Sequence, residues 1–274
     1  MNNIVLADNL AAMRTMPDAC FDLIYIDPPF NTGKDQLRLS QTAVPDEAGR
    51  KGFGGKSYRL ETHSSHAYSD KHEDFLEFLM PRLVAAKRLL KDDGSFFFHI
   101  DSRESHYCKV LLDEIFGRKH FMNEIVWAYD YGARSKKRWP MKHDVIFWYV
   151  KNPKDYVFRY EEIDRIPYMA PSLVGKEKAE RGKTPTDVWW NTIVPTSGGE
   201  KTGYPTQKPL AILERIIRVH TRDDARILDF FAGSGSLGDA AGKLKRTFTM
   251  IDCNKQACEI MQSRLKQYNC EFVS

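Results

Sequence analysis

The chain has 274 residues, 42% of them hydrophobic, which excludes a disordered protein and supplies enough apolar surface for a sizeable core. Its formal net charge of +4 permits binding to nucleic acid without requiring it. Five cysteines without CxxC spacing, no secretory signal and no apolar run near the ~20 residues that span a bilayer predict a cytoplasmic protein with reduced thiols, no metal and no membrane contact.

Strands and helices are expected to alternate along most of the chain. The predicted strands cover residues 3–8, 21–27, 94–101, 123–130, 143–150, 226–231 and 246–252. The predicted helices cover residues 9–16, 73–90, 102–117, 209–221, 234–244 and 254–268. Asn9, Ser102 and Gly117 are candidate helix caps, and Pro81 should kink or restart its helix. This alternation predicts an α/β fold with a mostly parallel sheet and helices on both faces.

Three polar segments interrupt this pattern. Residues 31–70 lack a sustained period, which predicts a long loop. Residues 130–142 contain RSKKRWP and should form a basic loop between two strands. Residues 160–205 are irregular, and the sequence VWW at 188–190 is typical either of core packing or of a recognition surface. We expect the first and third segments to form a lobe beside the sheet.

A strand runs into a glycine-rich turn at ILDFFAGSGSLG, residues 227–238. Gly233, Gly235 and Gly238 satisfy the GxGxxG pattern, in which glycines let a ligand approach the backbone and the helix N-terminus offers free N–H groups. Asp252, at the end of the next strand, has the spacing of the acid that binds ribose hydroxyls. An NAD-dependent dehydrogenase is therefore one interpretation, and a tight turn without a ligand is another.

Asp229 argues against a dinucleotide. It lies at the carboxyl end of the strand, four residues before the first glycine, where a carboxylate would repel a pyrophosphate and attract an ammonium group. S-adenosylmethionine has an ammonium group, a carboxylate that suits a helix N-terminus, a ribose, and no phosphate. The glycine turn and its two acids therefore favour S-adenosylmethionine as the cofactor.

The second motif is the sequence DPPF at residues 27–30. By itself, Asp27 followed by two prolines is compatible with a strand end and a rigid turn. The same rigidity suits methyl transfer to the exocyclic amine of a base, whose lone pair is delocalised into the ring. Asp27 can accept a hydrogen bond from one N–H of the amine and the carbonyl of Pro28 can accept one from the other, with Pro29 fixing the turn and Phe30 stacking on the base.

The motifs and their order carry a resemblance. DPPF comes first, TGYPTQKP (202–209) follows much later, and DFFAGSG (229–235) comes near the end. In this order the chain resembles the beta class of DNA amino-methyltransferases over nearly its whole length. The resemblance implies a Rossmann-like methyltransferase fold that is circularly permuted, forms one domain over residues 1–274 and carries a small inserted DNA-recognition lobe. The strand at 246–252 should then lie beside the strand at 3–8.

The same resemblance implies S-adenosylmethionine as cofactor and suggests which residues bind it. Asp8 should lie near the adenine, Asp229 near the ammonium group, Asp252 on the ribose, and Thr206 and Lys208 against the methionine end. The glycine turn should supply the remaining contacts, from Phe231, Ala232, Gly233, Ser234, Gly235 and Ser236. From the residues alone, Asp8 could equally cap a helix, and Lys208 could be a solvated lysine.

The target base is predicted from the first residue of DPPF. In this family Asp usually accompanies N6-adenine activity, and Ser or Thr accompanies N4-cytosine activity. Because a carboxylate is the stronger acceptor, Asp27 favours adenine. An N4-cytosine methyltransferase on the same scaffold is the alternative. A catalytically silent DNA-binding module is a second alternative, against which the intact DPPF argues.

A base inside a duplex must be flipped out before it can enter such a pocket. Arg134, Lys136, Lys137 and Arg138 are candidates for phosphate contacts, although a solvated basic hairpin is the alternative. We expect the 31–70 loop to be mobile and to lie at the mouth of the catalytic pocket, and residues 160–205 to carry target recognition. Double-stranded DNA is the expected partner, and a homodimer and a separately encoded restriction endonuclease are compatible with the family.

Overall fold

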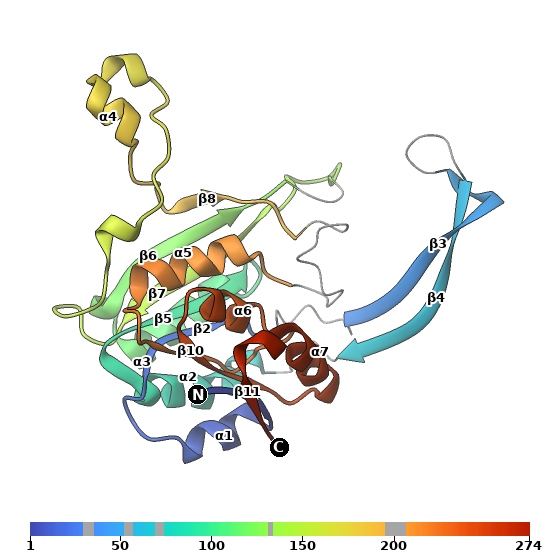
Figure 1. The fold of residues 1–274 in the computed structure, drawn as a ribbon, viewed down its shortest axis with the longest axis horizontal. Coiled ribbons are helices and arrows are strands. Elements are labelled where there is room, and N and C mark those ends of the chain that lie inside the picture. The colour runs from blue at the N-terminus through green and yellow to red at the C-terminus, as the bar shows by residue number, and fades with distance from the viewer. Residues whose placement is uncertain (30–35, 52–56, 69–73, 131–133, 195–206) are drawn as a thin grey trace.

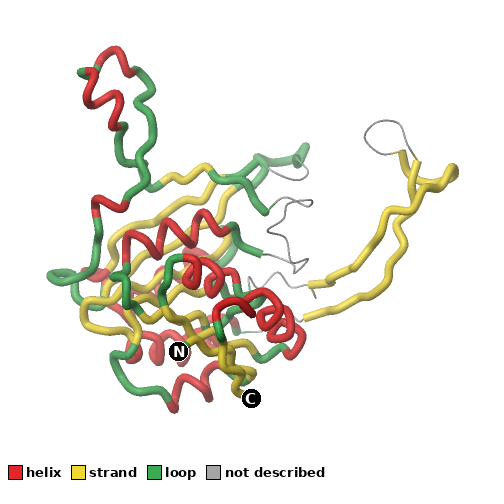
Figure 2. The backbone as a smooth tube through the Cα atoms, in the orientation of Figure 1, coloured by secondary structure: helices red, strands yellow, loops and turns green. Residues whose placement is uncertain are grey.

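The structure is a computed structural model that describes residues 1–29, 36–51, 57–68, 74–130, 134–194 and 207–274. Its body is a single nine-stranded sheet with helices on both faces, and a hairpin and a second excursion project from this body (Figures 1 and 2). The predicted α/β class is confirmed. Among the described residues, no helix is long and apolar enough to cross a lipid bilayer.

The nine strands lie in the order β11-β1-β10-β9-β2-β5-β7-β6-β8. Their bounds are β1 Asn2–Leu6, β2 Phe21–Ile26, β5 Leu90–Asp101, β6 Phe121–Ala128, β7 His143–Val150, β8 Val188–Trp190, β9 Arg226–Asp229, β10 Thr247–Asp252 and β11 Cys270–Val273. Neighbouring strands from β11 to β5 are parallel, whereas β7 is antiparallel to both β5 and β6. The carboxyl ends of the parallel strands therefore share one edge, called the carboxyl edge below.

Helices cover both faces of the sheet, as predicted. On one face lie α1 (Asn9–Thr15), α2 (Phe75–Leu89) and α3 (Ser105–Phe116), and on the other lie α5 (Leu210–His220), α6 (Ser236–Lys243) and α7 (Lys255–Leu265). Short 3-10 turns occupy Arg118–His120, Tyr160–Glu162, Pro171–Leu173 and Lys266–Tyr268. Successive β2 residues alternate between the two cores: Ile24 and Ile26 pack on the first face, and Leu23 and Tyr25 on the second.

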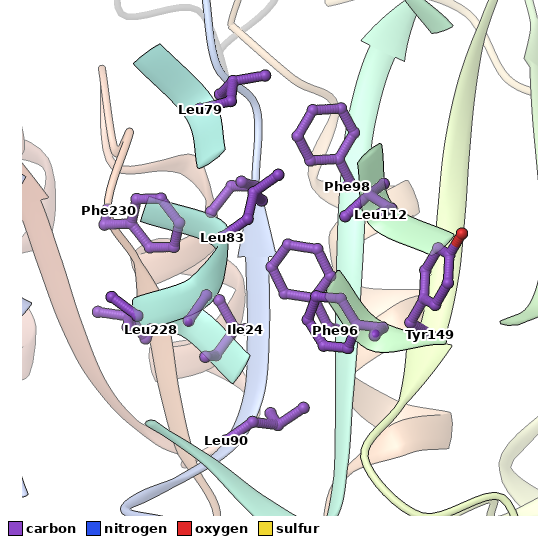
Figure 3. Packing of buried hydrophobic residues seen from close by; sticks show 14 of the residues in the cluster. Ile24, Leu79, Leu83, Leu90, Phe96, Phe98, Leu112, Tyr149, Leu228 and Phe230 are labelled. Atoms are coloured by element: carbon purple, nitrogen blue, oxygen red, sulfur yellow. The ribbon is translucent and has the colours of Figure 1, made fainter. Parts of the chain in front are cut away.

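Packing overrides the proline in α2. The helix continues through Pro81, so the predicted restart is wrong, while the predicted kink stays a prediction. Leu79 and Leu83 on either side of it are fully buried against the sheet, close to Phe98 (Figure 3). Burying each leucine stabilises the fold by about 1.5–3 kcal/mol, which offsets the ~3 kcal/mol that a proline costs inside a helix.

Two of the three predicted caps are wrong. Asp8, and not Asn9, is the N-cap of α1, because its Oδ1 accepts a hydrogen bond from the backbone N–H of Ala11 at 2.9 Å. Glu104 precedes α3 in place of Ser102. The prediction of Gly117 as the C-cap of α3 is confirmed, with a left-handed φ of 97°.

The permuted strand order is confirmed at the start of the chain. β1 pairs in parallel with β10, so the first strand lies beside a strand formed more than 240 residues later, from Thr249 to Asp252. The terminal strand β11 was not predicted, and it pairs with the other side of β1. Four residues at a chain end are too few to establish a period of two, and the pairing surface on β1 is not visible in the sequence.

The predicted long loop at 31–70 is wrong as a description of its regular structure. Two strands, β3 (Gln36–Lys51) and β4 (Ser57–Tyr68), form an antiparallel hairpin in a sheet of their own. The hairpin projects away from the body (Figure 1), so its strands do not need the apolar alternation that marks a half-buried strand. The predicted mobility of this segment stays a prediction.

The predicted irregular segment 160–205 contains one α-helix, two short 3-10 turns and one strand within its described part. A helix, α4 (Lys176–Arg181), lies at the end of an excursion far from the sheet (Figure 1), and the chain then returns through β8 to pair with β6. Val188 is 44% exposed and Trp190 76% exposed, so core packing is wrong for these two residues. Trp189 does pack against the core, beneath the guanidinium of Arg215 at 4.8 Å.

Candidate active site

Three carboxylates meet at the carboxyl edge. Asp27 follows β2, Asp229 ends β9 and Asp252 ends β10, and these three strands are adjacent in the sheet. Their charges act on one another, because Asp27 and Asp252 both raise the pKa of Asp229. The edge therefore concentrates negative charge at the place where open α/β sheets bind ligands.

Asp229 is a buried carboxylate. Its Oδ1 accepts a hydrogen bond from the backbone N–H of Phe231 at 2.9 Å, and within the described ranges no salt bridge reaches it. Burial first, and then the neighbouring carboxylates, raise its pKa well above the usual value, against the backbone hydrogen bond and the charge of Lys208. A cationic group from a ligand would remove this penalty.

The turn after β9 is tied to the end of β10 through Asp252. The backbone N–H of Gly233 donates to Asp252 Oδ2 at 2.8 Å, and that of Asn254 donates to Oδ1 at 2.9 Å. Burial raises the pKa of this carboxyl although both hydrogen bonds lower it. Asp252 thus fixes the position of the glycine turn relative to β10, and its side chain remains half-buried at the carboxyl edge.

Two of the three glycines are needed by the packing of α7. A Cβ on Gly235 would lie 2.8 Å from Met261 Cγ, and one on Gly238 would lie 2.9 Å from Leu265 Cδ1. Gly235 also has a left-handed φ of 72°. Gly235 and Gly238 therefore let helix α7 approach the turn. The expectation that a glycine admits a ligand applies to Gly233, whose φ is 50°.

The serines of the turn face Arg264 of α7. Arg264 Nη1 donates to Ser236 Oγ at 2.9 Å and to Ser234 Oγ at 3.3 Å, and its Nε lies 3.3 Å from Asp239 Oδ2. Both hydroxyls are buried, which leaves the backbone of Ser234 and Ser236 as the part that could meet a ligand. Arg264 was missed in the sequence, where nothing in its spacing relates it to the turn.

The other expected cofactor residues have structural partners. Asp8 caps α1 and pairs through Oδ2 with Arg82 Nη2 at 3.2 Å, so the alternative of a helix cap is confirmed for it. Phe231 is half-buried, with its ring 6.0 Å from that of Phe78, and Ala232 is buried. Thr206 and the DPPF residue Phe30 lie outside the described residues.

Asp27 is held by a lysine. Lys208 Nζ lies 2.5 Å from Asp27 Oδ2, and both side chains are largely buried. The other oxygen, Oδ1, is buried and has no hydrogen-bond partner among the described residues. Pro28 is buried and Pro29 half-buried behind it. One carboxylate oxygen therefore binds the ammonium group, and the second is an acceptor without a hydrogen-bond partner in the described part of the chain.

A chain of hydrogen bonds beside Asp27 was also missed. Tyr25 Oη lies 2.6 Å from His99 Nδ1, His99 Nε2 lies 3.2 Å from Asp144 Oδ2, and Tyr129 donates to Asp144 Oδ1 at 3.1 Å. Burial opposes ionisation of Asp144, but His99 and Lys208 lower its pKa overall. A histidine inside the apolar run FFFHI was the available signal, since a buried polar side chain needs partners.

The basic loop leaves the sheet from the same edge. It joins β6 to β7, whose paired ends are Ala128 and His143. The side chains of all four candidate residues are exposed: Arg134, Lys136, Lys137 and Arg138. Arg134 forms an ion pair with Asp130 at 2.6 Å. Trp139, next to these cations, is 92% exposed.

Comparison with known proteins identifies the family. The family model described as DNA methylase, for N6 and N4 enzymes, matches residues 21–263, so the chain belongs to the DNA methylase family. Enzymes of this family use S-adenosylmethionine. The chain is therefore a DNA methyltransferase of the N6/N4 family, and its permuted fold with a DPPF and a glycine turn agrees with that assignment.

Several relatives cover almost the whole chain. The type II methyltransferase M.HpaI of Haemophilus parainfluenzae is 27% identical over 96% of this chain and 73% of its own length. The DNA adenine methyltransferase YhdJ of Escherichia coli is 27% identical over 96% of this chain and 82% of its own.

Two solved structures have the same fold. The complex of M1.HpyAVI with S-adenosylmethionine aligns with a TM-score of 0.62 at 22% identity, over 97% of this chain and 99% of the other. The cytosine-N4-specific PvuII DNA methyltransferase aligns with a TM-score of 0.66 at 14% identity, over 96% of this chain and 86% of its own.

Proposed function

We propose that the protein is a DNA adenine-N6 methyltransferase that takes its methyl group from S-adenosylmethionine. The observation that carries this proposal is that a buried oxygen of Asp27, without a hydrogen-bond partner among the described residues, lies at the same edge as the carboxylates Asp229 and Asp252. The name of the relative YhdJ, a DNA adenine methyltransferase at 27% identity, supports the choice of adenine.

The residues present fit the proposed cofactor. Asp229 is a buried carboxylate that an ammonium group would stabilise, and Asp252 lies one strand further on, within reach of ribose hydroxyls by the spacing of the fold. The turn between them contacts both carboxylates: the backbone N–H of Phe231 donates to Asp229 and that of Gly233 to Asp252. When bound, S-adenosylmethionine supplies an electrophilic methyl group on a sulfonium.

Asp27 acts as an acceptor in the proposed reaction. Its Oδ1 accepts a hydrogen bond from one N–H of the target amine, and the carbonyl oxygen of Pro28 accepts one from the other N–H, which favours a pyramidal nitrogen with an available lone pair. Burial strengthens both hydrogen bonds because little water competes for them. In this proposal Phe30 stacks on the base.

The basic loop is the proposed duplex contact. Lys136, Lys137 and Arg138 are exposed cations on the edge that holds Asp27, and such charges hold phosphates while a base is flipped out. The exposed Trp139 beside them offers a stacking surface. The proposal also includes target recognition by residues 160–205, assembly as a homodimer and a separately encoded restriction endonuclease.

The test is the identity of the methylated base. The protein is incubated with S-adenosylmethionine and unmethylated genomic DNA, the DNA is digested to nucleosides, and their masses are measured after chromatographic separation. The proposal predicts N6-methyladenine. Formation of N4-methylcytosine would support the proposed cofactor and overturn the choice of adenine. Cytosine-N4 methylation is the second candidate function because the PvuII enzyme of the same fold is cytosine-N4-specific.

A further inference from the structure

Lys208 is placed on the catalytic candidate Asp27 by the fold. The two residues are 181 positions apart, and Lys208 Nζ lies 2.5 Å from Asp27 Oδ2. The lysine is 7% exposed, which is rare for an ammonium group unless it has a charged partner. The contact of Lys208 with the methionine end of the cofactor, which the family resemblance implies, stays a prediction.

The helix that follows Lys208 fixes where its side chain begins. Pro209 is the N-cap residue of α5, and Leu213, Ile216 and Ile217 on that helix are fully buried in the second core. A helix anchored over two turns cannot shift without exposing these side chains. The backbone of Lys208 is therefore held beside the site, and from there the ammonium group reaches Asp27.

The charge of Lys208 extends to two more carboxylates. It acts to lower the pKa of Asp144 and counteracts the burial that raises the pKa of Asp229. Asp144 is itself held by His99 and Tyr129. Lys208 thus lies in a cluster of acids, where one cation balances part of the negative charge that the edge accumulates.

We propose that Lys208 is a positioning residue for methyl transfer: by holding Oδ2 of Asp27, it turns Oδ1 toward the target amine. This inference rests on the proposed function. Without Lys208 the carboxylate could rotate, and neither oxygen would be directed at the base. The residue then contributes to the rate of the chemical step and little to the binding of cofactor or DNA.

The test compares Lys208→Met with a matched control. Lys208→Met keeps the length of the stem and removes the charge, and Lys208→Arg keeps a charge. The control is Lys91→Met. Lys91 bonds both oxygens of Asp22 at 2.8 and 2.9 Å, and Asp22 lies at the end of strand β2 opposite to Asp27. Single-turnover methylation of DNA, cofactor affinity by calorimetry and melting temperature are measured for each protein.

The inference predicts a split between chemistry and binding. In Lys208→Met the single-turnover rate at saturating cofactor should fall about 100-fold, while the cofactor Kd stays within about 3-fold of wild type. Lys208→Arg should recover about 10-fold of that rate. Lys91→Met should show a decrease in melting temperature similar to that of Lys208→Met and keep the wild-type rate.

Several outcomes would overturn the inference. One is a Lys208→Met protein whose cofactor Kd is at least ~10-fold higher while its rate at saturation is unchanged, which would make Lys208 a cofactor-binding residue. Another is a wild-type rate in Lys208→Met. A third is a rate loss that Lys208→Arg does not reduce and Lys91→Met shares, as expected of general destabilisation. If Lys208→Met does not fold, Lys208→Arg decides between these outcomes, and a wild-type protein that methylates no DNA would refute the proposed function itself.

Discussion

Two aspartates of the site differ in what surrounds them. Asp27 has a lysine on one oxygen, whereas Asp229 is buried with a single backbone donor on Oδ1. A carboxyl whose folded pKa is raised binds more protons in the folded state than in the unfolded state. Its contribution to stability therefore declines as pH rises above the ordinary value, and ionisation of Asp229 costs stability that a cationic ligand can restore.

Asp229→Asn should stabilise the free protein and weaken cofactor binding. Removing the buried charge should raise the melting temperature at pH 7, while the loss of a charged hydrogen bond should weaken cofactor affinity by about 10- to 100-fold. Differential scanning fluorimetry and calorimetry measure the two effects.

The matched control for this change is Asp113→Asn. Asp113 accepts from Lys109 and Tyr149 at 2.8 and 2.7 Å, so its loss should lower the melting temperature and leave cofactor affinity unchanged. A lower melting temperature in Asp229→Asn, or an unchanged cofactor affinity, would contradict the role given to Asp229.

At the scale of elements, the end of α5 carries a buried histidine. His220 lies among aromatic rings, with its centroid 4.4 Å from that of Trp148 and 4.9 Å from that of Phe97. Burial lowers its pKa from 6.5 to about 3. The folded state thus binds fewer protons than the unfolded state between these values, and stability is lost as pH falls through this window.

His220→Phe should flatten the acid side of the stability profile. Between pH 6.5 and 5 the wild type should lose unfolding free energy that the variant does not lose, with a slope that approaches about 1.4 kcal/mol per pH unit at the acid end. Urea unfolding at both pH values measures the difference. His106→Phe, at an exposed position of α3, is the control and should keep the wild-type dependence. Equal losses in His220→Phe and wild type would show that His220 is not the titrating group.

The β6–β7 loop should supply part of the salt dependence of DNA binding. Lys136 and Lys137 are exposed cations, whereas Arg134 already has a partner in Asp130. The double change Lys136→Gln and Lys137→Gln should reduce the slope of log affinity against log salt by about 2. The single change Arg134→Gln should alter it less. An unchanged slope in the double variant would show that Lys136 and Lys137 do not contact the DNA phosphates.

Sequence periodicity predicted the elements that bury a face. The strands around Ile24 and the helix containing Leu213 were found because their apolar spacing reflects contact with a core. The β3–β4 hairpin was missed because it projects from the body, and β11 because it consists of four terminal residues. Pattern methods detect burial, so an element without a buried face leaves little signal.

The candidate site was predictable where a motif fixed the strand end, and unpredictable where a partner came from a distant element. Asp27, Asp229 and Asp252 follow from short motifs at the ends of predicted strands. The contacts of Lys208 with Asp27 and of Arg264 with the glycine turn depend on how helices pack over the sheet, which no local spacing encodes.

At the scale of the whole molecule, the permutation brings the two motifs together. DPPF ends β2 and the glycine turn follows β9, and these strands are neighbours although about 200 residues separate them. Cofactor and target base would therefore meet between the ends of β9 and β2. β10 lies on the cofactor side of this point, and β5, β7 and β6 lie on the side of the target base. The basic loop between β6 and β7 lies on that other side, where the DNA would approach.

The most direct measurement is methyl transfer and cofactor binding by wild type and Asp27→Ala side by side. Wild type should form N6-methyladenine in DNA. Asp27→Ala should bind S-adenosylmethionine within about 3-fold of wild type and transfer the methyl group at least ~1,000-fold more slowly. An Asp27→Ala protein that methylates DNA at the wild-type rate would contradict the assignment of Asp27 as the acceptor that activates the amine.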